Sequence, residues 1–136
     1  MPRKKVVEES RPAEVPNPVI QTIPNSWRVS GQRMHIKIAG ICSVSMQPYE
    51  GTVHIEIALP PGECIEFCSV DTFVKWSASH EPHSAEQLAR EVCDAIVAAT
   101  GANRVTVTVE SDEGKASHSP VSVRAHGGAC CEPEAG

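Results

Sequence analysis

The stretch that decides the fold is QRMHIKIAGICSVSMQPYEGTVHIEIAL, residues 32–59. Apolar and polar residues alternate over 32–42 and again over 51–59, with a loop of about eight residues between the two runs. Alternation with a period of two is typical of strands that bury one face against a core. The two runs therefore predict a pair of antiparallel strands, whose inward residues are Met34, Ile36, Ile38, Val53, Ile55 and Ile57.

Two helices are predicted after this strand pair. Residues 63–76, ECIEFCSVDTFVKW, indicate a short strand end followed by a helix of about two turns. Residues 80–101 contain a capping box from Ser84 to Gln87, apolar residues at helical spacing and Gly101 as a stop. These features predict a second, amphipathic helix.

The C-terminal part of the chain predicts two more strands. RVTVTVE, residues 104–110, alternates strictly, and ASHSPVSVRA, residues 116–125, is a weaker strand in which Pro120 indicates an edge or a bulge. The order of elements is thus β-β-α-α-β-β. We expect an α+β domain with a four-stranded antiparallel sheet and both helices on one face. The open edges of such a sheet favour a homo-oligomer.

The length and charge of the chain limit its architecture and its partners. Its 136 residues suffice for one domain, placed at residues 19–125, between a disordered arm at 1–18 and a flexible tail at 126–136 that contains Cys130 and Cys131. The net charge of −5 gives no electrostatic basis for non-specific binding to nucleic acid or anionic membranes. No apolar run is long enough to span a membrane, and no secretory leader is present, so we expect a cytoplasmic protein with reduced cysteines.

Cys42 stands at the end of the first predicted strand, where two roles are open to it. A free cysteine is often a buried and inert core residue. Here Ser43, Ser45 and Gln47 make the following loop polar, which favours a nucleophile or a metal ligand. The residues alone leave both roles open.

Residues 20–110 resemble the QueF family of NADPH-dependent 7-cyano-7-deazaguanine reductases, which have the tunnelling fold. The family's T-x-P-N lead-in corresponds to QTIPN at 21–25, and its C-P-x-T-G-Q-P-D segment corresponds to CSVSMQPY at 42–49. Its V-E-x-K-S-L segment corresponds to IEFCSV at 65–70, and its F-H-E-D helix start corresponds to SAEQ at 84–87. The resemblance implies subunits that close into an oligomeric barrel, with active sites between neighbouring subunits.

The resemblance also implies a reaction and the residues that perform it. In the family, a cysteine thiolate adds to the nitrile carbon to form a covalent thioimide. NADPH then reduces the thioimide to 7-aminomethyl-7-deazaguanine in queuosine biosynthesis, a tRNA modification pathway. Cys42 aligns with the nucleophile and Glu86 with the glutamate that anchors the base. The other aligned positions are the substrate-lining Ile65, Glu66, Phe67 and Ala85 and, on the cofactor side, Ser69.

Two departures from the family pattern open alternatives to the reductase. The family's catalytic aspartate falls on Tyr49, and Glu50 is the adjacent acid that replaces it if the loop shifts by one residue. Both lysines, the tyrosine and the arginine of the family's NADPH-contacting segments are absent at the aligned positions, which read CSVDTF (68–73) and KWSAS (75–79) here. Opening of the thioimide by ammonia, as in amidinotransferase relatives of QueF, needs no NADPH. A protein that only binds the purine-like or pterin-like ring is a further alternative.

A metal site is the remaining alternative, from a more distant resemblance to type IB GTP cyclohydrolase. That family holds its metal with a strand-end cysteine, a histidine twelve residues later, a carboxylate and a second histidine. The corresponding residues here are Cys42, His54, Asp71 and His118. Thiolate, imidazole and carboxylate groups are suitable ligands for Zn²⁺ or a similar divalent metal.

Overall fold

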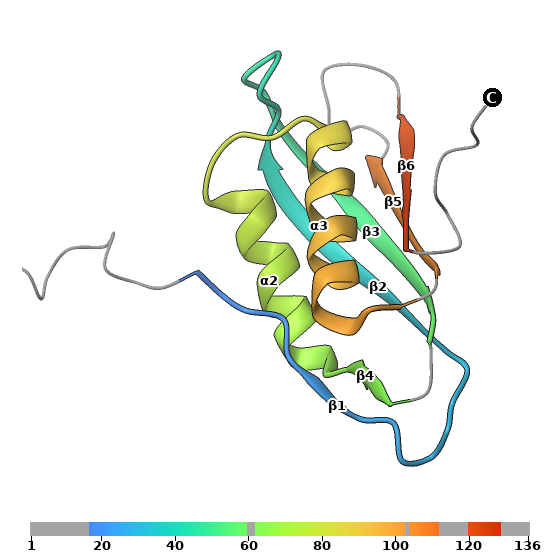
Figure 1. Cartoon of the computed structure of the whole chain (residues 1–136). Helices are drawn as coiled ribbons and strands as arrows, with labels where there is room; N and C mark the ends of the chain where they lie inside the picture. The colour runs from blue at the N-terminus through green and yellow to red at the C-terminus, as the bar shows by residue number, and fades with distance from the viewer. Residues whose placement is uncertain (1–16, 60–61, 103, 112–119, 129–136) are drawn as a thin grey trace, which may run out of the picture.

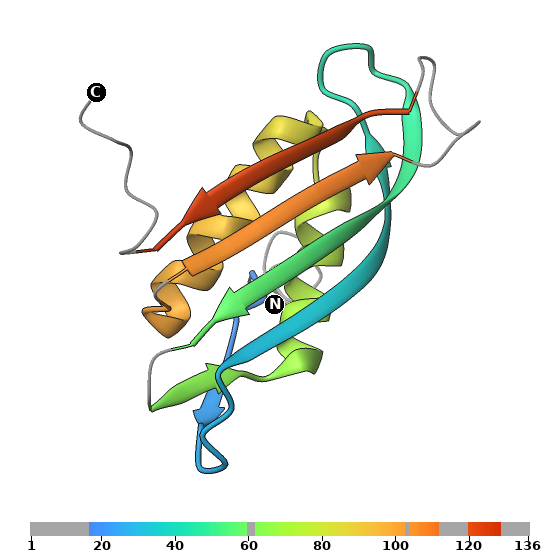
Figure 2. The same cartoon turned by 90° about the vertical axis from the view of Figure 1, so that its right-hand side faces the viewer.

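The computed structural model describes residues 17–59, 62–102, 104–111 and 120–128, and it shows an antiparallel sheet with two helices on one face (Figure 1). Figure 2 shows both helices behind the sheet. In chain order the elements are β1 (Thr22–Pro24), β2 (Gly31–Ile41), β3 (Pro48–Ala58), β4 (Glu63–Ile65), α2 (Phe67–Ser79), α3 (Ala85–Thr100), β5 (Arg104–Ser111) and β6 (Ser122–Gly127).

The main sheet has the strand order β2-β3-β5-β6, with every neighbouring pair antiparallel. The predicted four-stranded sheet and its order of elements are thereby confirmed. The β2–β3 pair aligns Gly31 with Ala58 at one end and Ile41 with Pro48 at the other. Edge strands β2 and β6 leave one row of backbone groups each without a partner strand in the described chain.

The core lies between the sheet and the helices, as the alternating pattern predicts. Val53, Ile55 and Ile57 of β3 are buried on the helix side, whereas His54 and Glu56 lie on the uncovered side. Helix α2 packs on β2, and α3 packs on β5 and β6. Each buried aliphatic side chain of this size contributes about 1.5–3 kcal/mol relative to an exposed one. The helix side of the sheet therefore supplies most of the driving force for folding.

Local signals in the chain place the ends of helix α3. The Ser84 hydroxyl accepts a hydrogen bond from the Gln87 N–H, and the Gln87 side chain accepts one from the Ser84 N–H, so the predicted capping box is confirmed. Gly101 ends the helix in the left-handed conformation, with φ of 66°. Residues at or next to the two ends of α3 therefore determine where this helix begins and ends.

The structure differs from the sequence-based prediction in three elements. Helix α2 runs from Phe67 to Ser79, longer than the predicted two turns, because Ser77 and Ala78 bury against the core. Residues Thr22–Pro24, for which no strand is predicted, form strand β1 and pair with β4. Strand β6 runs from Ser122 to Gly127, so it includes residues that the prediction placed in the tail.

Residues 1–16 of the predicted arm at 1–18 and residues 129–136 of the predicted tail, including Cys130 and Cys131, lie outside the described residues. Within the described part of the chain, neither helix combines the length and the apolar character needed to cross a membrane.

Gly40 allows close contact between β2 and α2. A Cβ atom at this position would lie 2.5 Å from the carbonyl oxygen of Ala78 and 3.5 Å from the ring of Tyr49. The contact with Ala78 is with backbone, which cannot move aside as a flexible side chain can. The absence of a side chain at Gly40 therefore sets how deeply α2 packs beside the Tyr49 ring.

We expect Gly40→Ala to lower the free energy of unfolding by about 1–3 kcal/mol, the usual cost of overpacking. Urea denaturation followed by circular dichroism measures this change. Gly31→Ala is the matched control, since its added Cβ would meet only the Ile57 carbonyl oxygen at 3.0 Å. Equal losses in the two variants would contradict the proposed role of Gly40.

Candidate functional site

Cys42 begins a short, closed loop between β2 and β3. Its N–H donates a hydrogen bond to the carbonyl of Gln47 at 3.0 Å, and its carbonyl accepts one from the N–H of Met46 at 2.8 Å. Met46 takes a positive φ of 59°, which a non-glycine residue seldom adopts. These constraints hold the backbone of Cys42 in one position instead of leaving it on a free hairpin loop.

The same loop favours ionisation of the Cys42 thiol. The backbone N–H of Ser45, the backbone N–H of Val44 and the Ser45 hydroxyl donate hydrogen bonds that lower the pKa of Cys42 below the ordinary thiol value. Burial and the carboxylate of Glu86 act in the opposite direction but do not cancel this effect. Because the thiolate is the nucleophilic form of cysteine, the loop makes Cys42 more reactive at neutral pH.

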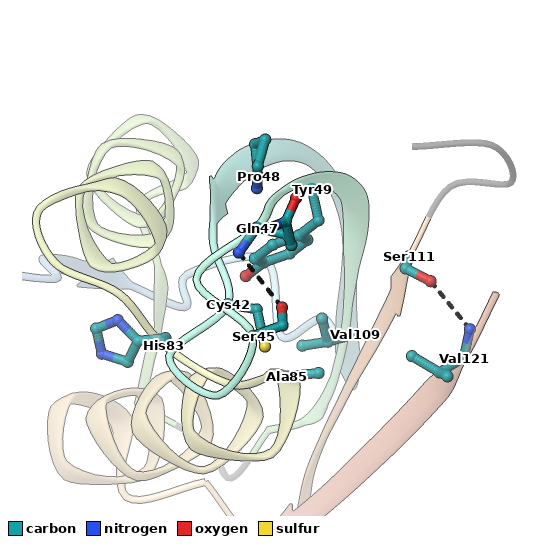
Figure 3. Close-up of a pocket in the computed structure, with 10 residues that line it drawn as sticks. All are labelled: Cys42, Ser45, Gln47, Pro48, Tyr49, His83, Ala85, Val109, Ser111 and Val121. Atoms are coloured by element: carbon teal, nitrogen blue, oxygen red, sulfur yellow. Dashed lines mark hydrogen bonds between the residues drawn. The ribbon is translucent and has the colours of Figure 1, made fainter. Parts of the chain in front are cut away.

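A small cavity lies beside the thiol (Figure 3). Its volume is about 40 Å³, which is room for a few water molecules at most. One chain can therefore admit a small reacting group here, but the rest of a purine-sized ligand must lie outside this cavity. The lining residues are Cys42, Ser45, Gln47, Pro48, Tyr49, His83, Ala85, Val109, Ser111 and Val121.

Tyr49 lines this cavity, and its buried hydroxyl has no hydrogen-bond partner among the described residues. The residue is 8% exposed, and its Oη atom is buried without a hydrogen-bond partner among the residues that the structure describes. Burial raises the pKa of the Tyr49 phenol, and the neighbouring Cys42 raises it further. The phenol is therefore neutral at physiological pH. A buried hydroxyl without a partner costs about 1–3 kcal/mol, which a ligand that accepts its hydrogen bond would recover.

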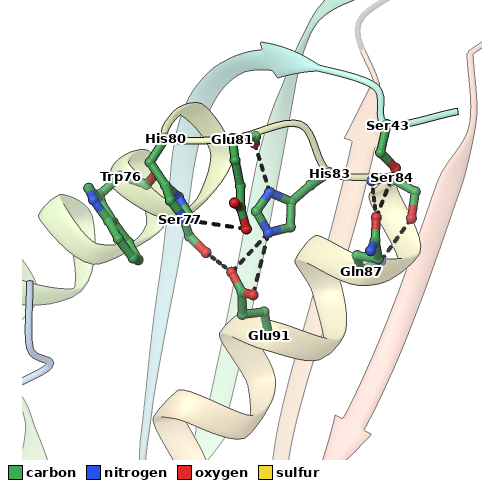
Figure 4. Close-up of polar contacts among 9 residues, drawn as sticks. All are labelled: Ser43, Trp76, Ser77, His80, Glu81, His83, Ser84, Gln87 and Glu91. Atoms are coloured by element: carbon green, nitrogen blue, oxygen red, sulfur yellow. Dashed lines mark hydrogen bonds and ion pairs between the residues drawn. The ribbon is translucent and has the colours of Figure 1, made fainter. Parts of the chain in front are cut away.

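His83 also lines the cavity, although no motif in the sequence points to it. The residue lies in the segment between α2 and α3, yet its side chain is only 4% exposed. Its Nδ1 lies 3.0 Å from the carbonyl of Glu81 and its Nε2 lies 3.2 Å from Oε1 of Glu91, which also accepts a hydrogen bond from the Ser77 hydroxyl (Figure 4). No spacing in the sequence marks this cluster, because its members come from α2, α3 and the segment between them.

Helix α3 and the segment before it hold the Cys42 loop in place. The His83 N–H donates to the carbonyl of Ile41 at 3.0 Å, at the last residue of β2. The Ser43 hydroxyl donates to Oε1 of Gln87 at 2.9 Å, the same oxygen that accepts from the Ser84 N–H (Figure 4). The cap of α3 is thus also an anchor for the Cys42 loop.

The predicted residues near the start of α3 divide into two groups. Ala85 lines the cavity, and Glu86 lies exposed in the first turn, near enough for its charge to act on Cys42. Glu50 does not share this cavity, because alternation along β3 directs Tyr49 toward the helices and Glu50 toward the other face. The structure therefore brings Tyr49 to Cys42 and leaves Glu50 away from it.

The predicted substrate and cofactor residues at 65–69 lie at the opposite end of the molecule from Cys42, beside β4 (Figure 1). Ile65 is buried in the β1–β4 pair, and Phe67 is exposed. Glu66 caps α2 by accepting from the N–H groups of Cys68 and Ser69, which lowers the pKa of its carboxyl group. The Ser69 hydroxyl accepts from the Gln21 N–H at 2.9 Å. One chain therefore cannot place these residues and Cys42 around the same ligand.

The alternative metal ligands are not gathered within one chain either. His54 lies on the uncovered face of the sheet and contacts Glu110 at 2.9 Å, whereas Asp71 lies on α2 and pairs with Lys75 at 3.1 Å. His118 lies outside the described residues. Among the residues that are described, no group of three histidine, cysteine or carboxylate side chains is arranged to hold a metal ion.

The hydrogen bonds to Cys42 predict how its reactivity depends on pH. Alkylation by iodoacetamide, followed by peptide mass spectrometry, should show a midpoint for Cys42 below that of an ordinary thiol. Ser45→Ala should move this midpoint upward, since it removes the hydroxyl donor and leaves the backbone donors in place. The lowered pKa of Cys42 also makes the stability of the fold depend on pH. The contribution of Cys42 to folding is present above the thiol pKa of the unfolded chain and is lost as the pH falls through the folded value. An unchanged midpoint in Ser45→Ala would contradict this assignment.

Glu91 predicts a stability effect at the wall of the cavity. Glu91→Ala should lower the free energy of unfolding by about 1–3 kcal/mol, because it leaves Nε2 of the buried His83 without its partner. Lys75→Ala, which breaks the exposed pair with Asp71, is the control and should cost no more than about 1 kcal/mol. Thermal or urea unfolding measures both changes. Equal, small losses would show that the His83 contact does not stabilise the fold.

Solved structures of other proteins share this fold. No family model and no curated protein matches the sequence. Among solved structures, an archaeosine synthase QueF-Like in the apo form superposes with a TM-score of 0.58 at 20% identity, covering 77% of this chain and 98% of that one. A protein described as a dihydroneopterin aldolase (FolB), from Vibrio cholerae O1 biovar El Tor str. N16961, gives a TM-score of 0.51 at 11% identity, covering 80% and 98%. The chain has the α+β tunnelling fold of these two proteins.

Proposed function

We propose that this protein is an enzyme that attaches Cys42 to the nitrile carbon of a 7-cyano-7-deazaguanine-type base. The observation that carries the proposal is the pairing of two groups at one cavity. Hydrogen bonds from the N–H groups of Ser45 and Val44 lower the pKa of the Cys42 thiol, and Tyr49, which lines the same cavity, has a buried hydroxyl without a partner among the described residues. The motif resemblance around Cys42 and the structural likeness to an archaeosine synthase QueF-Like support the choice of substrate class.

A nitrile suits this site because its carbon is a weak electrophile that needs a thiolate. The electron pair of Sγ forms a bond to the nitrile carbon, one π pair moves to the nitrogen, and the nitrogen takes a proton. The product is a thioimide bound to Cys42. The linear nitrile group is narrow enough for a cavity of about 40 Å³.

The second step that the residues favour is opening of the thioimide by ammonia to give an amidine. NADPH reduction needs contacts for the cofactor phosphates, and the described residues that line the cavity include neither lysine nor arginine. Ser69, the predicted cofactor contact, lies at the other end of the molecule from Cys42, where its hydroxyl accepts a hydrogen bond from the Gln21 N–H. Lys75, the remaining basic residue of that segment, is paired with Asp71. The described residues of one chain therefore do not fit an NADPH site.

The complete site would form between copies of this chain. Cys42 and the Glu66 segment lie at opposite ends of one molecule, so a ligand that touches both must contact two chains. The edge strands β2 and β6 offer unpaired backbone groups through which copies could extend the sheet. We propose a homo-oligomeric barrel that is closed through these edges.

The test is intact mass spectrometry after incubation with 7-cyano-7-deazaguanine. The expected result is a mass increase equal to the whole substrate, because addition expels no leaving group, and its absence in Cys42→Ala. Cys68→Ala is the matched control, because Cys68 is exposed and lies at the other end of the molecule from Cys42, and this variant should form the adduct normally. Added ammonia should then release the amidine and restore the original mass.

Other outcomes would reject parts of the proposal. The absence of an adduct at every pH from roughly 6 to 9, the range in which a thiol with a perturbed pKa ionises, would reject nitrile chemistry at Cys42. If the protein oxidised NADPH and formed the aminomethyl base, its reaction would be reduction of the thioimide and not formation of an amidine. Stoichiometric zinc that is lost in His54→Ala would favour a metal-dependent reaction instead.

A further inference from the structure

We propose that the Tyr49 phenol donates the proton to the nitrile nitrogen when Cys42 adds to the nitrile carbon. This inference rests on the proposed function and identifies the proton donor in its first step. Tyr49 lines the same cavity as Cys42, it is more than nine-tenths buried, and its hydroxyl has no partner among the described residues. Figure 3 shows Cys42, Ser45 and Tyr49 together at this cavity.

Several other polar groups that line the cavity already have partners. The Ser45 hydroxyl donates to Cys42 and accepts from the Gln47 N–H. The Ser111 hydroxyl accepts from the Val121 N–H at 2.9 Å, which leaves its own proton free, but an alcohol is a much weaker acid than a phenol. Both ring nitrogens of His83 have partners, in the Glu81 carbonyl and the Glu91 carboxylate.

No carboxylate replaces Tyr49 as the donor. The described lining of the cavity contains neither aspartate nor glutamate. Glu50, the acid adjacent in sequence, is on the other face of β3. Among the described residues that line the cavity, Tyr49 therefore carries the most acidic O–H group without a partner.

A neutral phenol is sufficient for this particular proton transfer. Addition of the thiolate places an electron pair on nitrogen, and the resulting anion is a much stronger base than a phenolate. The O–H bond of Tyr49 breaks, an N–H bond forms, and a phenolate remains. When ammonia adds to the thioimide carbon, the C–S bond breaks and returns its pair to Sγ, and the surplus proton of the nitrogen returns to the phenolate. The sum is nitrile plus ammonia giving amidine, with no oxidant or reductant.

The test compares two electrophiles in Tyr49→Phe. Iodoacetamide needs the Cys42 thiolate but no proton donor, whereas the small nitrile 2-cyanopyrimidine needs both. We expect Tyr49→Phe to slow the addition of 2-cyanopyrimidine to Cys42 by roughly 10²–10⁴-fold, the usual contribution of a general acid. Alkylation by iodoacetamide should change less than about threefold, since the thiolate does not depend on the phenol O–H for its hydrogen bonds. Peptide mass spectrometry at Cys42 measures both rates.

Two controls separate the role of Tyr49 from general damage. Ser45→Ala acts on the thiolate, so it should slow both reactions by the same factor. The melting temperature of Tyr49→Phe should stay equal to that of the parent or rise, because the variant removes a buried hydroxyl that has no partner. A lower melting temperature would show that the hydroxyl has a structural partner and would overturn the inference.

The remaining outcomes decide between this inference and the proposed function. Equal slowing of both electrophiles in Tyr49→Phe would mean that Tyr49 only positions Cys42, and unchanged rates with both would mean that it takes no part; either result overturns the inference. A Tyr49-dependent reaction with 2-cyanopyrimidine, but no adduct with 7-cyano-7-deazaguanine, would retain the proton donor and reject the substrate.

Discussion

The antiparallel register of β2 with β3 is the constraint on which the rest of this structure depends. It pairs all eleven residues of each strand, from Gly31 with Ala58 to Ile41 with Pro48. A slip of one residue would turn the aliphatic side chains of β3 outward and would also turn Tyr49 away from the helices. The large energy of burying the core therefore also determines which side chain faces the Cys42 thiol. The stability of the fold and the position of Tyr49 at the site therefore both depend on the β2–β3 register.

Around that register, the site is assembled by hydrogen bonds that serve two purposes. Gln87 caps α3 and accepts from Ser43, so the helix end also holds the Cys42 loop. The loop in turn directs the N–H groups of Val44 and Ser45 at the thiol. By contrast, the buried hydroxyl of Tyr49 has no partner in the part of the chain that the structure describes. Buried polar groups are nearly always paired in native proteins, so an unpaired one at a reactive cysteine suggests a ligand.

Sequence reasoning predicted the elements whose cause is local. The inward residues of β2 and β3 follow from alternation, and the ends of α3 follow from Ser84 and Gly101. Strand β1 was missed because three residues around Pro24 form a strand only by pairing with β4. The burial of His83 was missed because its partners, Ser77 and Glu91, come from different helices.

The sequence by itself determined the α+β order of elements, the faces of the strands and the place of Cys42 at a strand end, because periodicity and capping act between near neighbours. Only the tertiary structure decided which acidic or hydroxyl group accompanies Cys42. Tyr49 lies on the same side of β3 as the helices, whereas Glu50 lies on the other side, so Tyr49 accompanies Cys42. Cys42 and Glu66 lie at opposite ends of the sheet. These outcomes depend on packing between distant segments, since burial of the apolar face sets the direction of every other side chain on the strand.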